Sequence, residues 1–207
     1  MGNVAVAMEI PVKRKSPLNV MAVEIESKIQ VPGPDARLEL PEVLESLGLI
    51  VVASGHRTVK DVYMDTESKA VKGAGWALRF RQASDSVDLV RTQKALTPVT
   101  DGLAHREELE AVVSEMDASW EGQPLVESFK VFQDRWWFHV EPANGAFRIE
   151  ASYDFVQWRK AGTVPRPPAH VVELELLEGS VEALGALMER LLQIPEWKAA
   201  DWSKFLG

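Results

Sequence analysis

The sequence contains no cysteine among its 207 residues, and this absence removes several kinds of chemistry at once. Disulfides, thiolate metal sites and cysteine nucleophiles are excluded. A bound metal ion would have to use carboxylate, imidazole or backbone oxygen ligands, and the chain has four histidines but many glutamates. That balance favours magnesium or manganese over zinc. Because no feature requires an oxidising compartment, a cytoplasmic location is predicted.

Long apolar runs and a surplus of basic residues are also missing. No hydrophobic stretch approaches the length that crosses a bilayer, so no membrane contact is predicted. The formal net charge of −8 argues against a general nucleic-acid binder, but it allows a small anionic substrate because charges can cluster locally. The sequence has neither a P-loop nor a GxGxxG fingerprint, and no histidine has a serine or aspartate at the spacing of a catalytic triad.

Length and composition suit a single domain. Hydrophobic residues make up 46% and charged residues 26% of the chain, which is ordinary for a globular protein with one core. Residues 1–20 include the short basic cluster Lys13-Arg14-Lys15, and we predict that they form a flexible leader ahead of a domain over residues 21–207. The sequence leaves the oligomeric state open.

The most informative pattern is an alternation of charge near the start of the predicted domain. In a strand, Glu24, Glu26, Lys28 and Gln30 would lie on one face, because successive side chains point to opposite faces. Two carboxylates and an ammonium on one face can hold a hard cation together with the anion that accompanies it.

The same alternation returns along the chain and predicts about eight strands with mostly short connections. These strands cover residues 24–31, 61–65, 77–81, 89–94, 105–112, 135–140, 147–152 and 171–176. Asn144-Gly145 lies between two alternating runs and is the strongest hairpin signal. Helices are predicted over residues 35–47, 123–133 and 181–192, and Pro195 is predicted to begin a short final helix.

The polar faces of these strands carry full charges that are segregated by strand. Arg79 and Arg81 share one face of a predicted strand, and Glu173 and Glu175 share one face of another. One interpretation is an antiparallel sheet whose charged face is simply solvated. The other is a closed barrel with its charged faces turned inward. Carboxylates on one wall and cations on the other would then suit a metal-bound polyphosphate.

Ordered partial motifs resemble the CYTH superfamily, also called triphosphate tunnel metalloenzymes. Glu24-Ile25-Glu26-Ser27-Lys28 matches the ExExK signature of that family, and Ala77-Leu78-Arg79-Phe80-Arg81 is similar to its Leu-Arg-x-Arg strand. Further similarities follow in the family's order at residues 62–66, 92–94, 106–110, 147–154, 172–176 and 203–205. The resemblance covers roughly residues 22–205, which is nearly everything after the predicted leader.

The resemblance implies an α+β, mainly β fold. We therefore expect an eight-stranded antiparallel closed barrel that forms a tunnel, with flanking helices and a C-terminal helix. It also implies that Mg²⁺ or Mn²⁺ is held by Glu24, Glu26, Glu173 and Glu175, and that the phosphates are gripped by Lys28, Arg79, Arg81, Lys94 and Arg135. Glu26 and Lys204 would be catalytic, with Lys204 assisting the leaving phosphate. The second-rank candidates are Arg106, Glu108, Glu110, Glu150 and Asp154.

The function expected first is metal-dependent hydrolysis of inorganic triphosphate to diphosphate and phosphate. An alternative is hydrolysis of thiamine triphosphate or another organic triphosphate, which residues 31–35 and Trp76 favour mildly. A non-catalytic polyphosphate-binding module and an adenylyl cyclase are further alternatives. Leu18 and Asn19 stand where family cyclases often carry His-Phe, which counts against the cyclase. The expected partner is a small anionic triphosphate.

Overall fold

The computed structural model describes residues 20–99 and 102–200. In chain order the elements are β1 (Val20–Gln30), α1 (Ala36–Ser46), β2 (Leu49–Thr66), α2 (Ala70–Gly73), β3 (Trp76–Ala83), β4 (Leu89–Ala95), β5 (Leu103–Val113), β6 (Ser119–Trp120), β7 (Gln123–Pro142), β8 (Arg148–Arg159), β9 (Ala169–Glu178), α3 (Val181–Leu191) and β10 (Lys198–Ala199). Among the described residues, no helix combines the length and the apolar composition that a membrane span requires.

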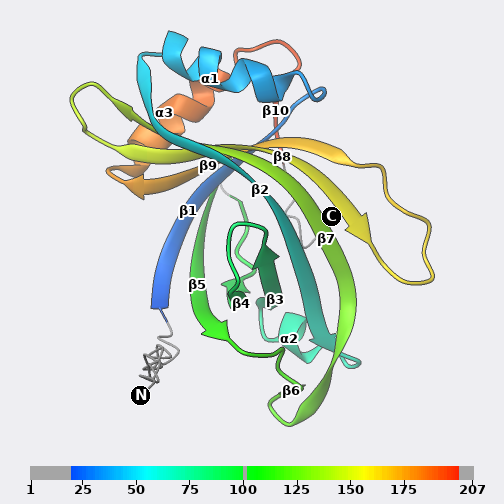
Figure 1. The fold of residues 1–207 in the computed structure, drawn as a ribbon. Coiled ribbons are helices and arrows are strands. Elements are labelled where there is room, and N and C mark those ends of the chain that lie inside the picture. The colour runs from blue at the N-terminus through cyan, green and yellow to red at the C-terminus, as the bar shows by residue number, and fades with distance from the viewer. Residues whose placement is uncertain (1–19, 100–101, 201–207) are drawn as a thin grey trace, which may run out of the picture.

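Eight of the strands form a closed antiparallel barrel. Neighbours follow the order β1-β5-β4-β3-β2-β7-β8-β9, and pairing of β1 with β9 closes the ring. The two-residue strands lie outside this ring, because β6 pairs only with β7, and β10 pairs with β1 beyond the last pair that β1 makes with β5. Figure 1 shows the long strands β2 and β7 curving around one side of the barrel. The predicted fold is confirmed.

Two helices cover part of the outer face of the barrel. α1 and α3 lie together, and the Arg190 guanidinium of α3 donates a hydrogen bond of 3.0 Å to the carbonyl of Leu47, just after α1 (Figure 1). Their apolar faces pack on outward-facing residues of β1, β7, β8 and β9, and the fully buried members include Ile29, Leu44 and Leu184. This cluster is the main core, and it leaves the inner face of the barrel for other side chains.

A second apolar cluster lies on the inner face. It contains Tyr63, Ala77, Val131, Val156, Trp158 and Val171, which alternate with outward-facing residues along their strands. Tyr63 and Ala77 also border the charged cavity described below. The lumen is therefore divided into an apolar part and a charged part.

Most sequence expectations about the elements agree with the structure. Helix α1 lies within the predicted 35–47, and Gly48 ends it with a positive φ of 83°. Ser180 caps α3 as predicted, because its hydroxyl accepts a hydrogen bond of 3.3 Å from the Ala183 amide. Asn144-Gly145 joins β7 to β8 in the predicted hairpin, with Gly145 at φ 64°.

Two predicted helices are wrong. Residues 123–133 belong to strand β7. Pairing with β2 from Leu125 onward and with β8 from Lys130 onward outweighs the helical spacing of the apolar residues at 125, 129 and 132. From Pro195 to Ala200 the chain forms a turn and strand β10, not a helix. The rest of that predicted helix, and the predicted leader apart from Val20, lie outside the described residues.

Candidate functional site

A cavity inside the barrel gathers the charged inner faces of most strands. All the residues predicted to bind metal or phosphate border it, as does the second-rank candidate Arg106. Its lining consists of Glu24, Glu26, Lys28, Tyr63, Ala77, Arg79, Arg81, Lys94, Ala95, Leu96, Arg106, Arg135, Glu173 and Glu175. Of the two interpretations of the charged faces, the inward-facing one therefore describes this protein.

Strand register explains why these side chains meet. On β1, Glu26 lies opposite Glu175 of β9, and Lys28 lies opposite Glu173. On its other edge β1 pairs with β5, where Arg106 is opposite Glu24. Directly opposed residues in an antiparallel pair bring their Cβ atoms to about 5 Å, so the alternation along each strand becomes a patch of neighbouring charges.

Glu26 is the centre of the carboxylate wall. The Lys28 ammonium lies 2.6 Å from its Oε1, the Arg106 guanidinium donates a hydrogen bond of 2.8 Å to the same atom, and Lys94 lies 3.7 Å from Oε2. Burial alone would raise the pKa of Glu26, but Lys28 and Lys94 outweigh it and hold the pKa well below its usual range. Glu26 is therefore ionised at neutral pH.

Arg135 is fixed by carboxylates on three sides. Its guanidinium donates hydrogen bonds of 2.7 and 2.6 Å to the two oxygens of Asp154, it also bonds to Glu173, and it lies 3.6 Å from Glu150. Burial would lower the pKa of Arg135, but Asp154 and Glu173 raise it well above its usual value. Asp154 is fully buried, so in this arrangement it holds Arg135 in position.

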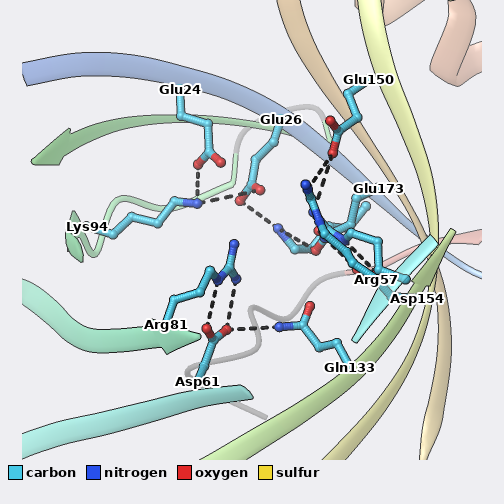
Figure 2. Close-up of polar contacts among 12 residues, drawn as sticks. Glu24, Glu26, Arg57, Asp61, Arg81, Lys94, Gln133, Glu150, Asp154 and Glu173 are labelled. Carbon is cyan, nitrogen blue, oxygen red and sulfur yellow. Dashed lines mark hydrogen bonds and ion pairs between the residues drawn. The ribbon is translucent and has the colours of Figure 1, made fainter. Parts of the chain in front are cut away.

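Arg79 and Arg81 are aimed by a buried carboxylate that the site prediction did not include. Asp61 on β2 is fully buried and accepts two hydrogen bonds of 2.8 Å from Arg81 and one of 2.9 Å from Gln133 (Figure 2). Arg79 lies 3.6 Å from the same carboxylate. Burial opposes the charge of both arginines, yet the pKa of each is raised, with Asp61 as an attractive partner.

Glu24 and Lys94 form an ion pair at the edge of the cavity (Figure 2). Burial, followed by repulsion from Glu26, raises the pKa of Glu24 even though Lys94 opposes that shift. Glu108 on β5 adds further negative charge nearby and lies 3.4 Å from the Arg79 guanidinium. The acidic side of the cavity therefore carries more negative charge than its cations locally compensate.

Glu175 is the clearest sign of that imbalance. Among the residues that the structure describes, no cation forms an ion pair with its carboxylate, although Glu173 two residues earlier has two such partners. Burial, then the neighbouring Glu24 and Glu150, raises the pKa of Glu175 to about 7. A carboxyl group in this state gains from any additional positive charge placed beside it.

Glu175 should make stability depend on pH. Its pKa is about 7 in the folded protein against an ordinary 4.5, so between those values the folded state binds the proton that the unfolded state releases. The contribution of Glu175 to the free energy of unfolding is present at low pH and is lost as pH rises through 7. Glu175→Gln should therefore raise the melting temperature at pH 8 and leave it nearly unchanged at pH 4.5, measured by circular dichroism in the presence of a chelator.

The control for this experiment is Glu178→Gln on the same strand, whose side chain is exposed. A melting-temperature difference between Glu175→Gln and the parent protein that stays constant from pH 4.5 to 8 would contradict the assignment.

The remaining second-rank candidates surround the cavity. Glu150 faces Arg135, and its carboxylate accepts a hydrogen bond of 3.1 Å from His139 Nε2. Glu110 accepts a hydrogen bond of 3.0 Å from the buried Thr92 hydroxyl and is itself exposed. Neither Glu110 nor Glu150 is among the residues that line the cavity, so their roles in the site stay predictions.

The site prediction missed Asp61, Gln133 and Arg57. Asp61 stands in an alternating run of the sequence, which is the available signal, but its position opposite Arg81 depends on the pairing of β2 with β3. Gln133 lies in the segment 123–133 that the sequence predicts to be a helix. Arg57 lies in the part of β2 that precedes the predicted strand 61–65. Trp76 packs against an apolar cluster beside α2 and is not among the residues that line the cavity. Lys204 lies outside the described residues.

The donor chemistry of the cavity fits a hard divalent cation. Its available ligands are carboxylate oxygens, and Glu175 beside Glu24 offers a protonatable carboxyl group where positive charge is favoured. Within residues 20–99 and 102–200, no three acidic or histidine side chains stand together in a ready ligand set. The reason is visible in the ion pairs: Lys94 engages Glu24, Lys28 engages Glu26, and Arg135 engages Glu173. A metal ion would take the place of these cations.

The fold and the cavity define a class of protein: a closed barrel whose lumen is lined by charged side chains of both signs. The CYTH domain family model matches residues 22–198, and the chain belongs to this family. No curated protein matches the sequence.

Solved structures agree in fold at low sequence identity. HpAC1 from Hippeastrum, described as having a dominant triphosphatase activity, is 19% identical over 88% of this chain and 93% of its own, with a TM-score of 0.59. The PH1819 protein from Pyrococcus horikoshii is 18% identical over 87% and 96%, with a TM-score of 0.58. The mimivirus capping enzyme triphosphatase is 13% identical over 83% and 88%, with a TM-score of 0.53.

Proposed function

We propose that the protein hydrolyses inorganic triphosphate to diphosphate and phosphate with Mg²⁺ or Mn²⁺. The observation that carries the proposal is the meeting of carboxylates and cations in one cavity inside the barrel. A polyphosphate and its metal ion need groups of both signs within the same few ångströms. The family match supports triphosphate chemistry, and the cytoplasmic location stays a prediction from the sequence.

The charge balance supports a substrate that arrives with a metal ion. Within the described residues, the lumen network contains seven cations, Lys28, Arg57, Arg79, Arg81, Lys94, Arg106 and Arg135. Against them stand nine carboxylates, Glu24, Glu26, Asp61, Asp85, Glu108, Glu150, Asp154, Glu173 and Glu175. Such a lumen has little net attraction for a free polyanion. A divalent cation among the glutamates would tip the balance toward binding it.

In this proposal each wall has its own task. Glu24, Glu26, Glu173 and Glu175 would hold the metal ion, which when bound supplies charge neutralisation at the substrate phosphates. Lys28, Arg79, Arg81, Lys94 and Arg135 would then exchange their carboxylate partners for phosphate oxygens. Phosphoryl transfer asks a protein chiefly for positioning and charge stabilisation, which these fixed side chains provide.

The attacking water needs an orienting group. Glu26 is suited to this task because the cations around it keep it ionised, so its carboxylate can accept a hydrogen bond from water. A carboxylate with a depressed pKa is a weak base. Its contribution is therefore to orient the nucleophile while the cationic wall stabilises the charge that develops on the phosphates.

A phosphate-release panel tests the function. The substrates are triphosphate, thiamine triphosphate, ATP and long-chain polyphosphate, each with Mg²⁺, with Mn²⁺ and with a chelator. We expect triphosphate to be hydrolysed fastest and only with metal. Preference for thiamine triphosphate would favour the organic substrate, cyclic AMP from ATP would identify a cyclase, and binding of triphosphate without turnover would identify a polyphosphate-binding module.

The cationic wall gives a second test of the proposal. Arg79→Ala and Arg81→Ala should each raise the KM for triphosphate and lower kcat, by roughly 1.5–3 kcal/mol in kcat/KM if one charged hydrogen bond is lost. Arg91→Ala is the matched control, since Arg91 is on β4 and donates a hydrogen bond of 2.6 Å to Asp117 but does not border the cavity. Parent-like kinetics in both Arg79 and Arg81 variants would exclude this strand from the site.

A further inference from the structure

Two arginines stand directly opposite each other on the inner face of the barrel. Arg57 of β2 pairs in register with Arg135 of β7. Like charges at directly opposed positions of an antiparallel pair destabilise a sheet, because their Cβ atoms are only about 5 Å apart. A pair of this kind needs a compensating anion. The protein places little negative charge close to Arg57.

Glu150 stands between the two arginines and is shared. Its Oε1 lies 3.5 Å from Arg57 (Figure 2). The same atom lies 3.6 Å from Arg135, and Oε2 lies 3.1 Å from His139 Nε2. One carboxylate therefore faces two guanidinium groups and an imidazole. Arg135 has further strong partners in Asp154 and Glu173, but Arg57 has no equivalent to them among the described residues.

The second contact of Arg57 is weak. Asp85, in the connection after β3, lies 3.6 Å from the guanidinium and is 45% exposed, while the Arg57 side chain is 26% exposed. Both contacts of Arg57 are longer than a good hydrogen bond. Ion pairs of this exposure contribute little to stability, so an incoming anion could replace Asp85 at little cost.

We propose that Arg57 extends the cationic wall beyond Arg135 and binds a fourth phosphate of a linear polyphosphate. This proposal rests on the function proposed above and makes Arg57 a determinant of chain length. A guanidinium suits that role, because its planar donors can bind two phosphate oxygens at once. With a short polyphosphate, Asp85 stays paired with the Arg57 guanidinium. A fourth phosphate that reaches Arg57 displaces Asp85.

The test compares linear tetraphosphate with triphosphate as substrates in the presence of Mg²⁺. In Arg57→Gln, the ratio of kcat/KM for tetraphosphate to kcat/KM for triphosphate should fall about tenfold, the effect of losing one charged hydrogen bond. In Asp85→Asn the same ratio should rise, because the competing carboxylate is gone. Lys60→Gln is the matched control, since Lys60 is exposed on the same strand and its side chain is on the other face.

An unchanged ratio in Arg57→Gln, or an equal fall in Lys60→Gln, would overturn the proposal. Calorimetric measurement of triphosphate and tetraphosphate binding in the presence of Ca²⁺ separates failure of the Arg57 proposal from failure of the proposed function. If the parent protein hydrolyses neither chain but Arg57→Gln weakens tetraphosphate binding more than triphosphate binding, the Arg57 assignment holds and the triphosphatase proposal fails. If Arg57→Gln weakens the binding of triphosphate and of tetraphosphate equally, Arg57 does not bind a fourth phosphate.

Discussion

Replacing Glu173 and Glu175 together with glutamine is expected to abolish metal-dependent turnover while the barrel still folds. Both carboxyl groups border the cavity, and they are opposite Lys28 and Glu26 in the register of β1 and β9. Removing two of the proposed metal ligands should lower kcat/KM by roughly a thousandfold or more, since a metal ion contributes several kcal/mol of charge stabilisation.

The fold should survive because the cations of the site keep other partners. Without the Glu173 carboxylate, Arg135 retains its two hydrogen bonds to Asp154, and Lys28 retains Glu26 at 2.6 Å. Neutralising Glu175 relieves a half-buried charge for which the described residues supply no ion pair. Calorimetric titration with Mn²⁺ should show lost binding, and circular dichroism should show an intact barrel.

Glu178→Gln is the control for the double substitution, because it changes an exposed glutamate near the end of the same strand. If the double variant binds Mn²⁺ and turns over triphosphate like the parent protein, Glu173 and Glu175 are not metal ligands. Their charges would then serve only to balance Arg135 and Lys28 inside the lumen.

Alternation made the barrel predictable. Because a strand separates odd from even positions, Glu24, Glu26 and Lys28 had to share a face, and so did Arg79 and Arg81. The family resemblance then supplied ring closure, which alternation alone does not specify. An open sheet with one solvated face produces the same pattern, and only the pairing of β1 with β9 distinguishes the two.

The partners of the charged residues could not be derived in the same way. Contacts such as Arg135 with Asp154 depend on which strands are neighbours and on their register. Asp61 is the plainest example, because its role in holding Arg81 follows from direct opposition across β2 and β3. The local sequence shows only that Asp61 is a carboxylate in a strand. Its role in positioning Arg81 follows from the pairing of β2 with β3.

Strand β7 shows where local spacing misleads. Leu125, Phe129 and Phe132 have helical spacing, but the segment pairs with the long strand β2 from Leu125 onward and also with β8 from Lys130 onward. Phe129 and Val131 then pack in the inner apolar cluster, while Phe132 points to the outer face. Tertiary pairing decides such a segment, since its apolar side chains can be buried in either conformation.

The described part of the chain ends at Ala200, beside residues of the site. Ala200 donates a backbone hydrogen bond of 2.9 Å to the Lys28 carbonyl, and together with Glu26, Lys28 and Arg106 it borders a small second cavity. Trp197, at 4% exposure, anchors the approach in the main core. Lys204 follows Ala200 by four residues in the sequence. The role of Lys204, which lies outside the described residues, stays a prediction from the sequence.

Lys204→Ala is accordingly expected to lower kcat for triphosphate by about a hundredfold or more with little change in melting temperature. Its ammonium would meet the negative charge that builds on the leaving phosphate, and one such preorganised donor contributes on that scale. Lys198→Ala is the control, because Lys198 is exposed on β10 in the same segment. If a stable Lys204→Ala protein turns over triphosphate at the parent rate, the anchoring of Trp197 and the pairing of β10 with β1 serve packing alone.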